Sequence, residues 1–91
     1  MNFEIDYTNA FKKDLRRAKA QHKDIDKLLL VVECLSEGFP LPDKHRDHLL
    51  FGDYHGAREC HIAPDWLLIY WVNFDKQIIV LDRLGMHSEL C

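Results

Sequence analysis

The stretch ARECHIAPDWLLIYWVN, residues 57–73, decides the fold of this chain. Its first residues alternate between two faces of a strand, with Glu59 and His61 on one face and a second set on the other: Arg58, Cys60 and Ile62. Pro64-Asp65 makes a turn, and Leu67–Val72 is apolar on both faces, as in a central strand. The stretch therefore predicts a strand, a tight turn and a second, buried strand.

A further strand and two helices precede this hairpin. Apolar and polar residues alternate over Asn2–Tyr7, which predicts a strand with one buried face. Thr8 or Asn9 can cap a first helix, and Asp24 can cap a second helix that ends at Gly38. The apolar residues expected to face the core are Phe3, Ile5 and Tyr7 in the strand, Phe11, Leu15 and Ala18 in the first helix, and Ile25, Leu28, Leu29, Val32 and Leu35 in the second.

The rest of the chain adds an irregular segment and one more strand. Two prolines open a polar, histidine-rich loop over residues 39–56. Residues 73–76 form a hairpin loop into a last strand over 77–84, and a short tail with His87 follows. The order is βααβββ. We predict one α+β domain over residues 1–91, with two N-terminal helices packed on one face of a mainly antiparallel sheet.

Composition limits the class of protein. The formal net charge of −3 argues against a protein held on nucleic acid by long-range attraction alone. The N-terminus lacks the pattern of a signal peptide, and the longest apolar run, Trp66–Val72, is too short to span a bilayer. We therefore expect a cytoplasmic protein without membrane association. Cys34, Cys60 and Cys91 share no CxxC spacing and are expected to be reduced thiols.

The first predicted helix carries a basic stripe on an otherwise acidic chain. Lys12, Arg16 and Lys19 recur at helical spacing, and Lys23 extends the row. Such a stripe is typical of a solvated helix face. It is also a candidate contact for an RNA backbone or for an acidic segment of a partner.

Titratable residues gather in the second half of the chain. His48, His61, Asp65 and His87 lie near predicted strand ends, so we expect them to converge at one edge of the sheet. A base that accepts the proton of an RNA 2′-hydroxyl and an acid that protonates the departing 5′-oxygen can cleave RNA without metal, and histidine suits both tasks. Arg83 is the candidate to offset charge in the transition state. No cofactor is indicated.

These residues also have other interpretations. His61 could simply be hydrogen-bonded on the sheet, Asp65 is a common turn former, and Trp66 fits a core as well as a stacking contact with a base. A metal site could be written from His45-x-x-His48 with His61 and Asp65. The metal interpretation is the weaker one, because the first two histidines lie in an irregular loop.

The same region carries a specific motif. Its parts are Asp47-His48-Leu49-Leu50, Gly52, Gly56, Arg58-Glu59-Cys60-His61-Ile62, Pro64-Asp65-Trp66-Leu67-Leu68-Ile69-Tyr70 and Arg83-Leu84-Gly85-Met86-His87-Ser88-Glu89-Leu90. This motif closely resembles the YafQ family of bacterial toxins, in the RelE/ParE superfamily of type II toxin-antitoxin systems. The likeness covers essentially the whole chain, including the helical hairpin with His22-Lys23-Asp24.

The resemblance implies a ribosome-dependent mRNA endonuclease that cuts in the A site and halts translation, and the acid-base set above predicts that it acts without metal. It also implies a cognate antitoxin, which neutralises the toxin in a hetero-oligomeric complex. By matching position, four residues take the family's catalytic places: His48, His61, Asp65 and His87. His87 is then the proton donor, and Asp65 or a neighbouring histidine is the base. Trp66 matches a residue near the active site, and Arg83 matches an arginine that contacts phosphate or the transition state.

Two alternatives stay open beside this expectation. A ParE-like relative would bind DNA gyrase and would not need three histidines. A binding-only relative with a decayed site is the other alternative. The family usually ends in an aromatic residue after Ser-Glu-Leu, where this chain has Cys91, and that difference bears on a final stacking contact with mRNA.

Overall fold

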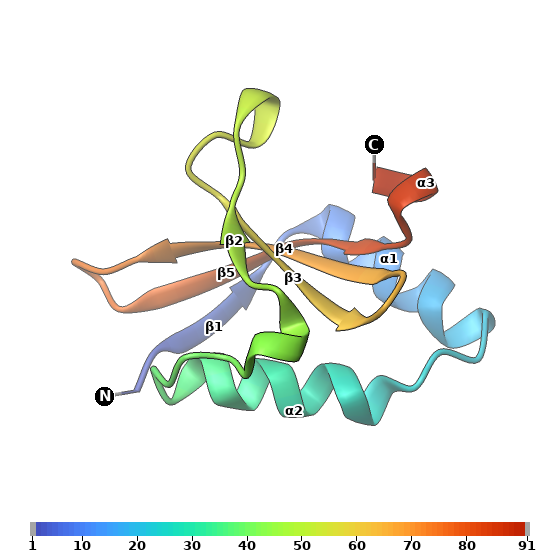
Figure 1. Ribbon diagram of the computed structural model, residues 1–91, viewed down its shortest axis with the longest axis horizontal. Helices are drawn as coiled ribbons and strands as arrows, with labels where there is room; N and C mark the ends of the chain where they lie inside the picture. The colour runs from blue at the N-terminus through green and yellow to red at the C-terminus, as the bar shows by residue number, and fades with distance from the viewer. Residues whose placement is uncertain (1, 91) are drawn as a thin grey trace.

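A five-stranded sheet with strand order β1-β5-β4-β3-β2 forms the centre of the protein. The computed structural model describes residues 2–90 (Figure 1). The strands are β1 (Glu4–Tyr7), β2 (His48–Leu49), β3 (Arg58–Ala63), β4 (Trp66–Asn73) and β5 (Ile78–Gly85). The helices are α1 (Asn9–Ala20), α2 (Ile25–Ser36) and α3 (His87–Leu90), with 3-10 turns η1 (Asp43–His45) and η2 (Gly52–Tyr54).

The sheet is antiparallel except at one edge, where β1 pairs with β5 in parallel. The α+β prediction with a mainly antiparallel sheet is confirmed. The predicted order lacks two short elements: β2, inside the segment expected to be irregular, and α3, where a tail was expected. Within residues 2–90, the helices are too short or too polar to cross a bilayer.

Both long helices pack into one core with the strands. Leu68 of β4 stands opposite Leu84 of β5 and Cys60 of β3, and all three are fully buried beneath the helices. The helix residues buried in this core are Phe11 and Ala18 of α1 and Leu28, Val31 and Leu35 of α2. Leu67 and Ile69 are buried on the opposite face of β4, as expected of a central strand. The side chains of β3 to β5 that share a face are therefore what hold α1 and α2 in place.

Two details of the predicted core are wrong. Leu29 was expected to face the core, but 58% of it is exposed, and Val31 is buried instead. Tyr7 was also expected in the core, but it is 52% exposed, and the Lys12 ammonium lies 5.8 Å from the centre of its ring.

The first strand begins at Glu4 rather than Asn2, and the Phe3 amide donates to the carbonyl of Ser36 at 2.6 Å. The start of the chain is thus tied to the end of α2.

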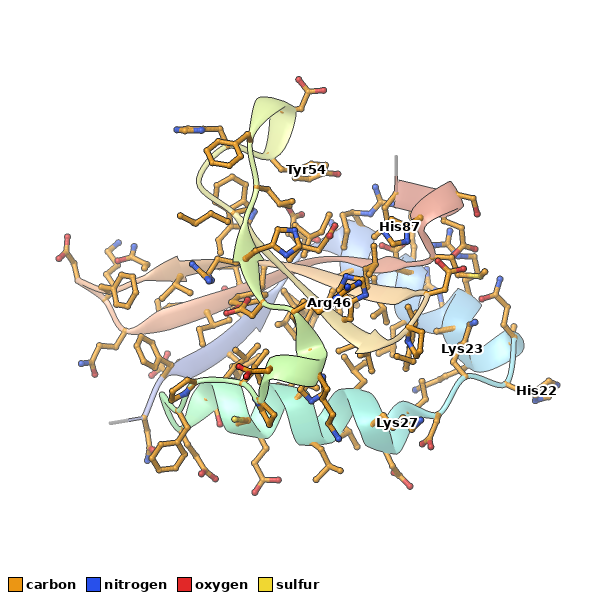
Figure 2. All side chains as sticks on the ribbon, in the orientation of Figure 1. His22, Lys23, Lys27, Arg46, Tyr54 and His87 are labelled. Carbon is orange, nitrogen blue, oxygen red and sulfur yellow. The ribbon has the colours of Figure 1, made fainter. Side chains whose placement is uncertain are left out.

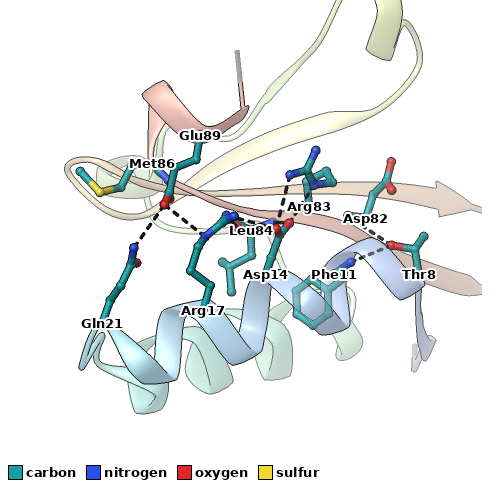
Figure 3. Close-up of polar contacts among 10 residues, drawn as sticks. All are labelled: Thr8, Phe11, Asp14, Arg17, Gln21, Asp82, Arg83, Leu84, Met86 and Glu89. Carbon is teal, nitrogen blue, oxygen red and sulfur yellow. Dashed lines mark hydrogen bonds and ion pairs between the residues drawn. The ribbon is translucent and has the colours of Figure 1, made fainter.

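A buried carboxylate joins α1 to β5. Asp14 is 3% exposed and accepts hydrogen bonds from Arg83 Nε at 2.8 Å, from the Leu84 amide at 2.9 Å and from Arg17 Nη2 at 3.1 Å (Figure 3). A buried charge is tolerated only when it is paired and hydrogen-bonded. Thr8 caps the same helix, since its Oγ1 accepts from the Phe11 amide at 3.0 Å.

A second polar anchor holds the segment before β3 on the sheet. Asp47 accepts from the Tyr70 hydroxyl at 2.6 Å and from Arg58 Nε and Nη2 at 3.2 Å. Burial, followed by the nearby Asp47 carboxylate, raises the pKa of Tyr70, so the phenol stays a donor. Arg58 and Glu59 are neighbours in the sequence but have different partners, Asp47 and His48. This anchor is why the loop expected to be irregular contains an ordered strand, β2.

The Asp14 anchor predicts a large loss of stability on truncation. Asp14→Ala leaves Arg83 and the Leu84 amide without their buried acceptor, and we expect the free energy of unfolding to fall by about 3 kcal/mol. Urea denaturation at neutral pH measures the loss. Asp75→Ala, at an exposed loop position, is the matched control and should change stability by less than about 0.5 kcal/mol. Equal stabilities of the two variants would contradict the anchor.

Candidate active site

His87 and Asp65 form the most exposed part of the site. Asp65 lies in the turn between β3 and β4, and His87 is the first residue of α3. The His87 Nδ1–H donates to Asp65 Oδ1 at 3.0 Å, and both side chains are more than half exposed. The hydrogen bond from His87 lowers the pKa of Asp65 below its ordinary value, so Asp65 is a carboxylate at neutral pH. With Nδ1 engaged, the Nε2 atom of His87 is left to face a substrate.

The His61 ring, like that of His87, is held through its Nδ1 atom by a protein acceptor. It is 9% exposed, and its Nδ1 lies 3.3 Å from the Pro64 carbonyl oxygen. A carbonyl can only accept, so Nδ1 carries the proton and Nε2 of neutral His61 keeps a lone pair. The ring centres of His61 and His87 are 5.9 Å apart. The structure therefore brings together three of the four predicted catalytic residues, with the two imidazole rings next to each other.

His48 does not contact this trio. Its Nδ1–H donates to the Arg46 carbonyl at 2.6 Å, and its Nε2 lies 3.5 Å from Glu59 Oε1. In the β2–β3 register His48 stands opposite Glu59, two residues before His61 on β3. The expectation that all four residues meet is wrong for His48. Its place on β2 puts it beside Glu59 rather than beside His61. Glu59 was not predicted to take part, although its alternation with Cys60 placed it on the face of His61.

Arg83 is occupied by protein partners. Its guanidinium donates from Nε and Nη2 to the two oxygens of Asp14, at 2.8 and 3.3 Å, and it also hydrogen-bonds Tyr54. The hydrogen bond to Asp14 is the largest influence and raises the pKa of Arg83 against the opposing effect of burial. Arg83 thus stays cationic, but its charge is largely balanced by Asp14. Tyr54 was missed because a lone tyrosine in a loop carries no sequence signal for a site. Figure 2 shows it on the loop above the sheet.

The remaining predicted contact residues divide into buried and exposed. Trp66 is 3% exposed and belongs to the hydrophobic core, which favours its core interpretation over stacking on a base. The stripe residues on α1, Lys12, Arg16 and Lys19, are all exposed. His45, named from the sequence as a possible metal ligand, is half-buried and donates from Nδ1 to the His61 carbonyl at 2.7 Å. Cys91, in place of the terminal aromatic, lies outside the described residues.

A polar clamp holds α3, and with it His87, against α1. Glu89 accepts from the Met86 amide at 2.8 Å through Oε1, and through Oε2 it accepts from Arg17 Nε at 3.1 Å and Gln21 Nε2 at 3.2 Å (Figure 3). Arg17 also reaches the Leu84 carbonyl at 3.3 Å. A four-residue helix has no stability of its own. Its position, and that of His87, therefore depends on Glu89.

The possible metal ligands are dispersed by these contacts. His45 uses Nδ1 on a backbone carbonyl, and His48 points to Glu59 rather than to His61. Among residues 2–90, no three His, Cys, Asp or Glu side chains are placed together so that they could hold a metal ion. The four-ligand set written from the sequence does not form in this geometry.

Comparison with known proteins identifies the family. The sequence profile of a family described as a bacterial toxin of type II toxin-antitoxin system, YafQ, matches residues 3–91. The chain belongs to the YafQ family. The mRNA interferase toxin YafQ of Escherichia coli K12 is 35% identical over 88 residues, which cover 96% of this chain and 94% of that protein.

Solved structures of YafQ and related toxins share the fold. The toxin in a crystal structure of the E. coli DinJ-YafQ toxin-antitoxin complex is 34% identical, with a TM-score of 0.89 over 99% of this chain and 98% of that one. A metal-bound toxin from Helicobacter pylori is 38% identical, with a TM-score of 0.92 over 98% and 99% of the two chains. The predicted YafQ resemblance is confirmed.

The hydrogen bonds that Glu89 accepts should depend on pH. The Met86 amide, followed by Gln21 and Arg17, lowers the pKa of Glu89, so the clamp is fully formed above the ordinary glutamate value of about 4.3 and is lost as the pH falls through the lowered value. Glu89→Ala should remove it at every pH. We expect Met86 and His87 amides to exchange with solvent at least about tenfold faster in this variant, measured by NMR. Glu33→Ala, on the exposed side of α2, should leave these rates unchanged.

Proposed function

We propose that this YafQ-family toxin cleaves mRNA on the ribosome by acid-base chemistry, with His61 as base and His87 as acid. The observation that carries the proposal is the pair of imidazoles, 5.9 Å apart, whose Nδ1 atoms are both engaged by protein acceptors. The relative named an mRNA interferase supports RNA as the substrate.

The first step is attack by the substrate's own 2′-hydroxyl. His61 Nε2 accepts the hydroxyl proton, and the 2′-oxygen forms a bond to the adjacent phosphorus. The bond from phosphorus to the 5′-oxygen breaks, and His87 Nε2–H gives its proton to that oxygen. The products are a 2′,3′-cyclic phosphate and a 5′-hydroxyl. One proton enters the protein at His61 and one leaves at His87, so the step is balanced.

Asp65 acts through His87 rather than as the base. Its lowered pKa makes it a weaker proton acceptor than an ordinary aspartate, and its oxygen already accepts the His87 proton. A carboxylate on Nδ1 fixes the orientation of a histidine ring and so directs Nε2 of His87 at the leaving oxygen. We therefore assign Asp65 as a positioning residue and His61 as the base.

Phosphate contacts fall to residues around the two imidazoles. Arg83 keeps N–H groups beyond those that Asp14 occupies, and Tyr54 lies beside it, so both can donate to phosphate oxygens. His48, paired with Glu59, is assigned to the adjoining stretch of RNA. The exposed stripe of Lys12, Arg16 and Lys19 provides positive charge for ribosome or message on a chain of net charge −3.

The partners and compartment follow from the same assignment. The DinJ-YafQ structure is a toxin-antitoxin complex, and we assign a cognate antitoxin to this chain, in a hetero-oligomeric complex. A toxin that acts on translating ribosomes works in the cytoplasm and needs no membrane. Neither the gyrase-binding nor the binding-only alternative gives the two oriented imidazoles any use.

A metal-assisted reaction is the second candidate, because the H. pylori relative is described as metal-bound. In this chain the reaction would need His45 or His48 to leave its present hydrogen-bond partner. A metal-activated water would leave 5′-phosphate or 3′-phosphate ends without passing through a cyclic phosphate. Product analysis therefore separates the two candidates.

Loss of the proton donor should abolish most of the activity. His87→Asn cannot protonate the leaving oxygen, and we expect the rate of cleavage of a defined message on translating ribosomes to fall by about 10² to 10⁴. His22→Asn is the control: His22 is exposed in the turn between α1 and α2 with φ of 60°, a conformation that asparagine accepts. A fully active His87→Asn protein would remove His87 from the mechanism.

The substrate itself tests the nucleophile. A message with a 2′-deoxynucleotide immediately 5′ to the cut should resist cleavage, because it lacks the attacking oxygen. Cleavage of the unmodified message should continue when transition metals are chelated at a magnesium level that keeps ribosomes intact. Cutting of the deoxy message, or loss of activity on chelation with recovery on adding zinc or copper, would favour the metal-assisted reaction.

A further inference from the structure

We propose that the groove between α2 and η1 holds the nucleotide on the 5′ side of the cut, and that Arg46 pairs with the phosphate 5′ to that nucleotide. RNA as the occupant rests on the proposed function. The direction of the message and the role of Arg46 rest on the groove itself, through its position beside His61 and its charge.

The groove is continuous with the candidate active site. It encloses about 770 Å³, and the described residues that line it include His61 and Pro64 but not His87. This volume lies within the range of about 300 to 1,000 Å³ that is typical of small-molecule pockets. The groove therefore extends from the His61 side of the two imidazoles.

The two imidazoles give the message a direction. In the proposed reaction His61 accepts the proton of the 2′-hydroxyl, which belongs to the nucleotide on the 5′ side of the cut. His87 protonates the 5′-oxygen of the nucleotide on the 3′ side. The 5′ nucleotide therefore lies nearer to His61, and the groove that adjoins His61 receives the part of the message 5′ to the cut.

The rim of the groove is cationic. Lys27 of α2, Lys44 of η1 and Arg46 just after η1 are exposed, and no carboxylate among the described residues lines the groove with them. Within residues 2–90, none of the three forms an ion pair with another side chain. Each nucleotide of a message carries one negative charge on its phosphate, so this rim is complementary to RNA.

Arg46 is available to a phosphate, whereas the other two arginines near the site are occupied. Arg58 pairs with Asp47, and Arg83 pairs with Asp14. An arginine presents a planar fork of N–H donors that matches two oxygens of one phosphate. An unpaired guanidinium at the rim of the groove can therefore bind a phosphate without giving up a protein partner.

Contacts on both sides hold the backbone of Arg46. His48 donates to the Arg46 carbonyl at 2.6 Å, and the Arg46 amide donates to the Asp43 carbonyl at 3.0 Å. His45 donates to the His61 carbonyl at 2.7 Å, which ties this segment to β3. Arg46 lies in the left-handed region, with φ of 48°, on the segment that crosses in front of the sheet in Figure 2. A backbone fixed in advance lowers the entropy lost on binding.

The floor of the groove suits a nucleobase. Val31, Leu41 and Ile62 are apolar, and His45 lines the groove with them. Bases have apolar faces, and in proteins that bind single-stranded RNA they stack on side chains that include histidine. The groove thus offers apolar contact to the base and positive charge to the phosphate of the same nucleotide.

A neutral linkage in the message tests the contact. A methylphosphonate replaces one charged phosphate oxygen with a methyl group and is placed at the linkage 5′ to the nucleotide that precedes the cut. For wild-type protein on translating ribosomes, kcat/KM should fall by about 10- to 100-fold, as expected for the loss of a contact between charged groups. Arg46→Gln should show the same loss on the unmodified message and almost no further loss on the modified one.

Two matched variants show that the effect belongs to this contact. Arg46→Lys keeps the charge and should recover most of the lost kcat/KM. Lys76→Gln removes an exposed charge from the loop between β4 and β5 and should respond to the methylphosphonate as wild-type protein does. Independent effects of Arg46→Gln and the methylphosphonate would overturn the assignment, because only groups in contact are coupled. Coupling of Arg46 to a linkage 3′ to the cut would overturn the direction of the message.

Binding without cleavage separates this contact from the proposed chemistry. The same methylphosphonate is placed in a message with a 2′-deoxynucleotide before the cut, and the affinity of the protein for ribosomes that carry this message is measured. The methylphosphonate should weaken binding of wild-type protein by about tenfold and leave binding of Arg46→Gln unchanged. That coupling, without cleavage of the unmodified message, would refute only the proposed function. Normal cleavage by Arg46→Gln together with weaker binding of the cognate antitoxin would assign the groove to the antitoxin instead.

Discussion

The fold depends on how one buried negative charge is satisfied. Asp14 reaches the end of β5 from α1 and is met there by two arginines and a backbone amide. Water cannot hydrate it, so these donors must stay in place, and they fix the relative position of helix and strand. Arg17 also forms an ion pair with Glu89, and this pair fixes the position of α3. The placement of His87 is a consequence of this chain of contacts, although His87 itself lies in solvent.

The two imidazoles receive their tautomers from different kinds of acceptor. His61 is held by a backbone carbonyl, a neutral acceptor within its own turn, while His87 is held by a carboxylate. The Pro64 carbonyl keeps a proton on Nδ1 of His61 and leaves its Nε2 free to accept one, while the Asp65 carboxylate holds the His87 ring in place. The tight turn at Pro64-Asp65 supplies both acceptors. One short turn therefore orients both imidazoles, which we propose to act as base and acid.

Alternation and turn chemistry made the sheet predictable, because each is a local property. The hairpin of residues 57–73 and the meeting of His61, Asp65 and His87 followed from strand ends that must lie side by side. What could not be predicted depends on contacts between distant residues. Three leucines in a row on α2 fit several helix phases, and packing alone buries Leu28 and leaves Leu29 and Leu30 exposed. Arg83 is bound by a residue 69 positions away, and the pairing of His48 with Glu59 depends on a two-residue strand without a pattern of its own.

The parallel pairing of β1 with β5 joins the two ends of the chain. Glu4–Tyr7 finds its partner only when Ile78–Leu81 exists, and the pairing cannot form in a shorter chain. The acid proposed for catalysis comes later still, at His87. During synthesis β1 therefore remains unpaired until Ile78–Leu81 has been added, and the residue proposed as the acid is added later still. The candidate active site therefore cannot fold until the ribosome has added His87, well after both long helices have been made.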